Sequence, residues 1–149
     1  MVVAARTAEM TDRGRRRVIG LLLACAVLLA VHWAAWLVDR SLLASDTRPA
    51  YYEFQSAFVL ADAWLAGCLV AAARALAARR PSALLWMLVA AGSGGFLLGL
   101  DVLYNLQHGV WFAGQRGLVE LLRNLATLAG TVGLLGWAWP RRAELLAGG

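Results

Sequence analysis

Three polar residues stand at helical spacing in an otherwise apolar stretch between Gly94 and Trp111. Asp101, Asn105 and His108 are separated by four and three residues, so one face of a helix carries all three. A carboxyl, a carboxamide and an imidazole together can bind a cation or transfer protons. Such groups are costly in hydrocarbon, and we expect them to point into a bundle of helices rather than at lipid.

Other apolar stretches carry polar residues at a matching depth. At a rise of about 1.5 Å per residue, His32, Asp62 and Arg123 each lie about 9 Å below the outer end of their stretch. We therefore expect one shared cluster in the outer half of a bundle, with Arg123 facing Asp62 and Asp101, because an intramembrane guanidinium needs carboxylates. The candidate ligand-binding residues are His32, Asp62, Asp101, Asn105, His108, Glu120, Arg123 and Asn124.

The elements that must position these residues are membrane spans, because 61% of the 149 residues are hydrophobic and only 15% are charged. Four runs have the roughly 20 apolar residues needed to cross a bilayer core. We predict an all-α fold, an antiparallel four-helix transmembrane bundle over residues 18–139, between a flexible basic cytoplasmic tail, 1–17, and a cytoplasmic C-terminal tail, 140–149. The predicted spans are 18–38, 56–77, 83–104 and 118–139.

The arginines set the expected orientation. All fourteen basic residues are arginine, and ten lie on the side of both termini if the spans alternate in direction. The positive-inside rule then places both termini in the cytoplasm. Because an alanine- and arginine-rich chain without lysine is typical of a high-GC bacterium, we expect a multi-pass protein of a bacterial cytoplasmic (plasma) membrane. The ten are Arg6, Arg13, Arg15, Arg16, Arg17, Arg74, Arg79, Arg80, Arg141 and Arg142.

The formal net charge of +5 does not predict a nucleic-acid partner, because the arginines flank the spans and no soluble domain presents them. The expected partners are the lipid bilayer and a small-molecule or lipid ligand. Ala63, Gly67 and Ala71 recur every four residues, and Gly95 and Gly99 form a GxxxG motif. Because such patterns let helix backbones approach closely, a helix–helix oligomer or a membrane partner is also considered.

Motifs for metal and redox chemistry are missing from the sequence. It has no HxxxH or HExxH pair, no GxSxG and no glycine-rich phosphate loop beside a strand. A divalent metal held by His32, His108 and an aspartate would be repelled by Arg123. Cys25 and Cys68 have no CxxC partner. We predict no metal, no cofactor and no disulfide.

Three functions fit this pattern. The cluster forms a pocket for a small cationic molecule or lipid headgroup, or it only fixes helix packing in a structural or partner-binding subunit, or it performs acid–base or metal-dependent chemistry on a lipid. Three acids against one deep arginine favour the pocket, because surplus polarity in hydrocarbon requires water, a ligand or a cation. Tyr51, Tyr52 and Trp111 are then expected near a mouth on the outer face, and catalysis is not expected.

Two tracts carry a resemblance. YYEFQSAFVLADAW, from Tyr51 to Trp64, and DVLYNLQHG, from Asp101 to Gly109, resemble an uncharacterised group of small bacterial four-span integral membrane proteins. The resemblance implies the four-span architecture and no assigned activity, so it transfers no catalytic residue. The plan of four helices with intramembrane acids is also similar to that of the sterol-isomerase and sigma-2 receptor superfamily, which is an analogy of architecture alone.

Overall fold

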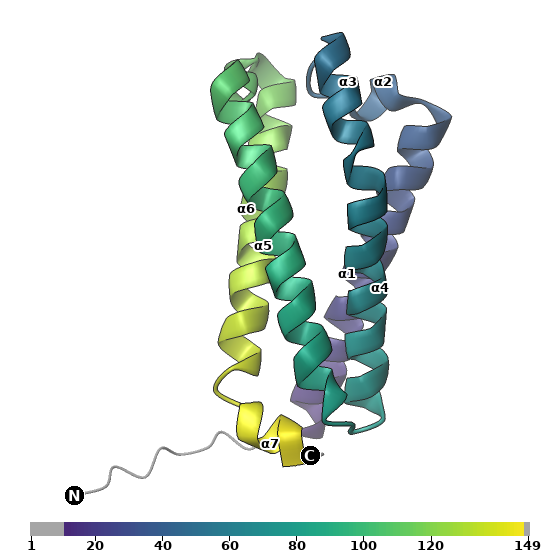
Figure 1. The fold of residues 1–149 in the computed structure, drawn as a ribbon, viewed down its shortest axis with the longest axis vertical. Coiled ribbons are helices and arrows are strands. Elements are labelled where there is room, and N and C mark those ends of the chain that lie inside the picture. The colour runs from purple at the N-terminus through teal and green to yellow at the C-terminus, as the bar shows by residue number, and fades with distance from the viewer. Residues whose placement is uncertain (1–10, 148–149) are drawn as a thin grey trace, which may run out of the picture.

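The structure, a computed structural model, describes residues 11–147 and is helical over most of that range (Figure 1). Four long helices dominate: α1 (Asp12–Val38), α4 (Phe58–Ala77), α5 (Ser82–His108) and α6 (Gly114–Ala138). The short elements are α2 (Arg40–Leu43), α3 (Pro49–Ser56), the 3-10 helix η1 (Val110–Phe112) and α7 (Arg142–Ala147).

Within residues 11–147, four helical stretches are long and apolar enough to cross a membrane, which confirms the predicted all-α class and the presence of four candidate spans. They are α1, α3 together with α4, α5 and α6, and they contain 25 to 29 residues each. A helix of 27 residues such as α5 is about 40 Å long, whereas a bilayer core is about 30 Å thick. Such a helix is therefore longer than a perpendicular crossing of the bilayer core requires.

The long helices pack in chain order. α1 packs on α4, α4 on α5 and α5 on α6, while α1 and α6 do not pack along one another within residues 11–147. Figure 1 shows α2 and α3 at one end of the molecule, and α7 and the α4–α5 connection at the other. The ring of helices is therefore not closed between its first and last members.

Several helices extend beyond the predicted spans. Thr11 caps α1 by accepting a 3.1 Å hydrogen bond from the Gly14 amide, so the last six residues of the predicted N-terminal tail, 12–17, are helical. Residues 1–10 of that tail lie outside the described range. At the other end of the chain, α7 occupies most of the predicted C-terminal tail, and Leu145 is buried in the core.

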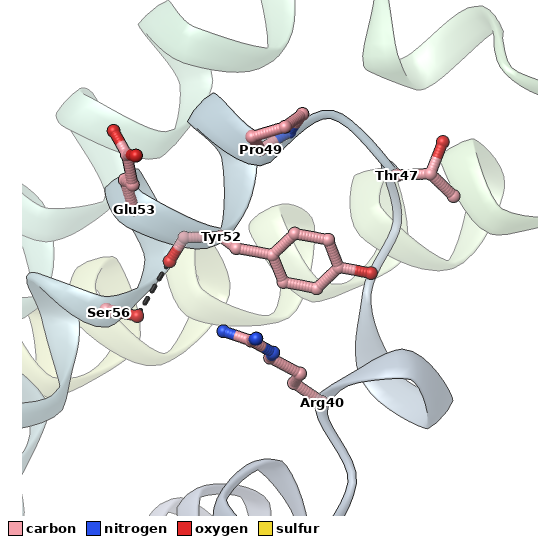
Figure 2. Close-up of a pocket in the computed structure, with 6 residues that line it drawn as sticks. All are labelled: Arg40, Thr47, Pro49, Tyr52, Glu53 and Ser56. Carbon is pink, nitrogen blue, oxygen red and sulfur yellow. Dashed lines mark hydrogen bonds between the residues drawn. The ribbon is translucent and has the colours of Figure 1, made fainter.

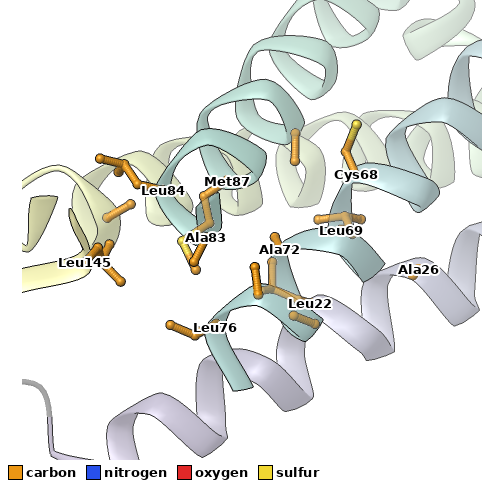
Figure 3. Packing of buried hydrophobic residues seen from close by; sticks show 14 residues of the cluster. Leu22, Ala26, Cys68, Leu69, Ala72, Leu76, Ala83, Leu84, Met87 and Leu145 are labelled. Atoms are coloured by element: carbon orange, nitrogen blue, oxygen red, sulfur yellow. The ribbon is translucent and has the colours of Figure 1, made fainter. Parts of the chain in front are cut away.

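Two apolar clusters hold the bundle together. The first, near the α7 end, is built from small and medium side chains such as Ala72, Leu76 and Met87, with Leu145 of α7 against it (Figure 3). The second, near the α2–α3 end, is aromatic and includes Trp36, Tyr51, Phe58, Tyr104 and their neighbours. Alanine-rich faces let helices approach closely, whereas the aromatic cluster fills the wider end of the bundle.

Glycines bring α5 and α6 close together. A Cβ atom on Gly94 would lie 3.1 Å from Thr131 Oγ1, and one on Gly95 would lie 3.6 Å from the Cγ2 atom of the same threonine. By contrast, a Cβ atom on Gly99 or Gly67 would have no neighbour within 4 Å. Neither glycine therefore makes a close helix contact within the described chain, and the oligomer or membrane partner considered from these motifs stays a prediction.

Candidate functional site

An ion pair on α6 forms the centre of a polar cluster near the α2–α3 end. Arg123 pairs with Glu120, one helical turn earlier, and Glu120 is only 1% exposed. Ser45, from the loop between α2 and α3, donates its hydroxyl to Glu120 Oε2 and accepts a 2.9 Å hydrogen bond from Arg123 Nη2. Each of the three side chains therefore contacts the other two.

Ser45 is held in this position by Tyr51. The Tyr51 side chain is fully buried, and its hydroxyl accepts a 3.3 Å hydrogen bond from the Ser45 amide. Pro49 is the first residue of α3, where its missing N–H costs no helical hydrogen bond, and Tyr51 follows in the same turn. Tyr51 was expected at a pocket mouth, and Ser45 was not predicted, because one serine in a loop has no periodicity to mark it.

Asp101 of α5 anchors the second part of the cluster. Its carboxyl accepts a 2.6 Å hydrogen bond from Asn124 Nδ2 of α6 and a 3.5 Å hydrogen bond from Gln55 Nε2 of α3. Asn105, which is completely buried, donates through Nδ2 to Asn124 Oδ1 at 3.3 Å. Side chains from α3, α5 and α6 therefore meet around one carboxyl. Gln55 was not among the predicted residues.

Asp62 of α4 has a separate neutral donor. Trp33 Nε1 of α1 donates a 2.9 Å hydrogen bond to Asp62 Oδ2, and the Trp33 side chain is buried. Trp33 was not among the residues expected in the cluster. A buried indole N–H usually has a hydrogen-bond acceptor, and helical spacing alone does not indicate which one.

Electrostatic interactions join these parts into one site. Asp62 interacts with Asp101, Asp101 with Glu120, and Arg123 with His32, which is partly buried on α1. All four long helices therefore contribute to the cluster. Of the eight predicted residues, the seven other than His108 belong to this connected set.

The expected partners of Arg123 were wrong. Among residues 11–147, its ion pair is with Glu120 rather than with Asp62 or Asp101. Residues three apart on a helix are neighbours, so Glu120 is within reach of the guanidinium without any contribution from helix packing. Asp62 and Asp101 are instead satisfied by neutral N–H donors of Trp33 and of side-chain amides.

His108 lies outside the cluster. It is exposed, its ring stacks on Tyr104 with centroids 4.1 Å apart, and its Nδ1 lies 3.0 Å from the Tyr104 carbonyl oxygen. Gly109, in the left-handed conformation, ends α5 directly after it. Within residues 11–147, no three of the histidines, cysteines and acids are grouped so as to hold a metal ion.

Two buried atoms of the cluster have no hydrogen-bond partner within the described chain, Asn105 Oδ1 and Arg123 Nε. Tyr104 Oη and Trp111 Nε1 are also buried without a hydrogen-bond partner in the described chain. An unsatisfied buried polar group costs about 1–3 kcal/mol. Water or a ligand that met these atoms would recover that free energy.

The opposite end of the bundle is strongly basic. Asp12 pairs there with Arg15 at 2.7 Å and with Arg79 at 3.3 Å. Basic groups at one end of a bundle favour the cytoplasmic side and contact with anionic lipids. A pocket of about 460 Å³ at this end is lined by Asp12, Arg13, Arg16 and Arg17.

In chemical terms, the cluster combines three carboxyls, one guanidinium and several amide and hydroxyl groups. Such a set can hold a cation between oxygen atoms or keep a proton on one of its carboxyls. No protein-family model matches the chain, and the comparisons with curated proteins and with solved structures likewise found no match.

Proposed function

We propose that this is a multi-pass protein of a bacterial cytoplasmic membrane and that its polar cluster binds a small cation, such as a protonated amine. The proposal includes an antiparallel bundle with both termini in the cytoplasm. This orientation is supported by the arginine-rich end at the start of α1 and by the arginine asymmetry of the sequence. The cluster then lies in the outer half of the membrane.

The observation that carries the proposal is that Asp62 and Asp101 form no ion pair with a cationic side chain of residues 11–147. Glu120 is neutralised by Arg123, but the hydrogen bonds that the two aspartates accept come from Trp33 and from side-chain amides. The aspartates also repel one another when both are ionised. A cation held between them removes the repulsion and neutralises charge that is costly in hydrocarbon.

Trp33 offers a direct test, because its indole donates to Asp62. Ethylammonium chloride added to the protein in phosphatidylcholine nanodiscs should change the tryptophan emission, and Trp33→Phe should abolish the change. Asp62→Asn and Asp101→Asn should each weaken binding about tenfold or more, the effect of one charged contact.

Asp39→Asn is the matched control. It removes one negative charge near the same end of the molecule, while asparagine caps α2 as well as aspartate does. Binding that is the same in all three aspartate variants, or no change in emission with ethylammonium, sodium and choline, would reject the cation site.

A second function is favoured by the contacts of the α1–α4 connection, residues 39–57. Ser45 and Gln55 of this connection bond to the cluster, and Arg48 Nη2 donates to the His108 carbonyl oxygen at 3.3 Å. In this alternative the cluster fixes helix packing and positions the connection for a partner protein. This alternative would be supported if a variant without the charged residues of the cluster kept its fold and if the unaltered protein bound no cation.

A further inference from the structure

A second polar pocket lies on the α1–α4 connection, and none of its lining residues belongs to the cluster. Its volume is about 590 Å³. Figure 2 shows the Arg40 side chain extending beneath the ring of Tyr52, with Glu53 and Ser56 along α3. The lining residues are Arg40, Thr47, Pro49, Tyr52, Glu53 and Ser56.

Most charged residues of the α1–α4 connection form hydrogen bonds or an ion pair with other residues of the connection. Asp39 caps α2 by accepting from the Ser41 amide at 2.9 Å and from the Ser41 hydroxyl at 2.6 Å. Asp46 and Arg48 form an ion pair, with a 2.5 Å hydrogen bond from Arg48 Nε to Asp46 Oδ2. Two charged residues of the connection remain, Arg40 and Glu53.

Arg40 and Glu53 line the same pocket but do not pair with each other. Neither forms an ion pair with any residue of 11–147, and both are exposed. Among the residues that the structure describes, the pocket thus presents one cation and one anion that lack an ion-pair partner. A ligand with opposite charges at its two ends can neutralise both.

The guanidinium of Arg40 is also oriented for an anion. Its central carbon lies 5.1 Å from the centroid of the Tyr52 ring, so the aromatic face holds the planar group by a cation–π contact. The N–H donors at the edge of the plane have no acceptor within the described chain, and this edge matches the oxygens of a phosphate. Tyr52 in turn contacts Trp36 of α1, with ring centroids 5.9 Å apart.

We propose that this pocket binds a zwitterion of the phosphoethanolamine type, with its phosphate on Arg40 and its ammonium on Glu53. Trp36 and Tyr52 are the residue types enriched at membrane interfaces, so the pocket lies at the level of lipid headgroups in the proposed topology. The same chemistry is found in the headgroup of phosphatidylethanolamine and in free phosphoethanolamine. The site differs from the cation site of the polar cluster and does not depend on it.

Two measurements distinguish the sources. In the first, the protein is reconstituted in nanodiscs of phosphatidylcholine with phosphatidylethanolamine, extracted in detergent, and the retained lipid is measured by native mass spectrometry. In the second, free phosphoethanolamine is titrated calorimetrically into protein in phosphatidylcholine nanodiscs. Retention identifies the lipid as the source, whereas heat of binding identifies the soluble zwitterion, and either result supports the site.

Arg40→Gln and Glu53→Gln should each weaken the observed binding about tenfold or more, the loss expected for one charged contact. Arg116→Gln is the control, since Arg116 is an exposed arginine at the start of α6 and does not line the pocket. Binding that is unchanged in both pocket variants, equal retention of phosphatidylglycerol, or no binding in either measurement would overturn the proposal.

Discussion

Glu120 is 1% exposed, whereas the side chain of its ion-pair partner Arg123 is 35% exposed. The pair therefore joins the closed interior of the cluster to the less covered side of α6. Arg123 also interacts electrostatically with His32 of α1, although α1 and α6 do not pack along one another. Removal of the exposed partner alone would leave a buried carboxylate without its cation.

Arg123→Ala should therefore destabilise the protein by about 3 kcal/mol, the cost of breaking a buried pair from one side. The measurement is the unfolding midpoint in detergent. Arg116→Ala, which removes an exposed arginine from the first turn of the same helix, should change it little. Equal midpoints for the two variants would show that the Glu120–Arg123 pair does not stabilise the fold.

Replacement of the whole ion-paired set should cost less than the single change. The triple variant Ser45→Ala, Glu120→Leu, Arg123→Leu removes all three polar side chains that contact one another. None of them is then left buried without its partner. Well-packed apolar replacements of buried ion pairs are often neutral or stabilising. The triple variant should thus melt above Arg123→Ala, and a lower midpoint would mean that the polar contacts themselves hold the α1–α4 connection in place.

Gly117→Ala should destabilise the turn between α5 and α6. A Cβ atom at Gly117 would overlap the Val110 carbonyl oxygen and lie 2.8 Å from the Trp111 carbonyl carbon, because η1 packs directly on the first turn of α6. The strain should cost about 1–3 kcal/mol, as overpacking does. Thermal unfolding in detergent measures it.

Gly130→Ala is the matched control for that change. Gly130 lies in the same helix, is exposed, and a Cβ atom there would have no neighbour within 4 Å. Alanine in a helix interior is favoured over glycine by about 0.5–1 kcal/mol, so this variant should be unchanged or more stable. A comparable loss of stability in both variants would contradict the close packing of η1 on α6.

Much of the fold followed from local patterns. Apolar runs and turn residues were enough to find four spans, because span length is set by bilayer thickness and does not depend on tertiary contacts. The stripe formed by Glu120, Arg123 and Asn124 indicated a polar face on α6, since helical periodicity is also a local property. The structure places two members of that stripe, Glu120 and Asn124, in the buried part of the cluster.

The partners within the cluster could not be predicted in the same way. Ser45 reaches Glu120 across 75 positions of sequence, and Trp33 reaches Asp62 across 29. Such contacts depend on how helices rotate about their axes, and a rotation of one residue, about 100°, changes every partner. Arg123 was expected to pair with the aspartates because an intramembrane guanidinium needs a carboxylate, whereas Glu120 on the same helix was nearer.

The ion pair between Asp46 and Arg48 predicts a loss of stability in acid. The hydrogen bond from the Arg48 side chain, with further backbone hydrogen bonds, holds the pKa of Asp46 below its ordinary value of 3.8, against a smaller opposing effect of burial. A carboxyl whose pKa is lowered on folding stabilises the folded state above the unfolded pKa, and this contribution is lost as the pH falls through the folded value.

The unfolding midpoint should accordingly decline below about pH 4 more steeply in the wild-type protein than in Asp46→Asn. Above pH 5 the wild-type protein should be the more stable of the two, and the difference should shrink as the carboxyl is protonated. A constant difference from pH 6 to pH 3 would mean that the pair does not contribute to folding.

The proposed orientation predicts opposite results for reporters placed in successive connections. Thr47 and Phe112 are exposed residues of the two connections at the α2–α3 end, whereas Arg80 is exposed in the connection between α4 and α5. Alkaline phosphatase, which needs an oxidising compartment, should be active when fused after Thr47 or Phe112. Green fluorescent protein should be fluorescent after Arg80.

The arginines provide the control for that experiment, because they are the proposed cause of the orientation. Replacement of Arg13, Arg15, Arg16 and Arg17 by glutamine removes positive charge next to the first predicted span, 18–38, without changing any residue within the four predicted spans. The fusions should then report mixed or inverted topology. Active phosphatase after Arg80 in the unaltered protein would place the basic end outside, and with it the polar cluster would lie in the cytoplasmic half of the membrane.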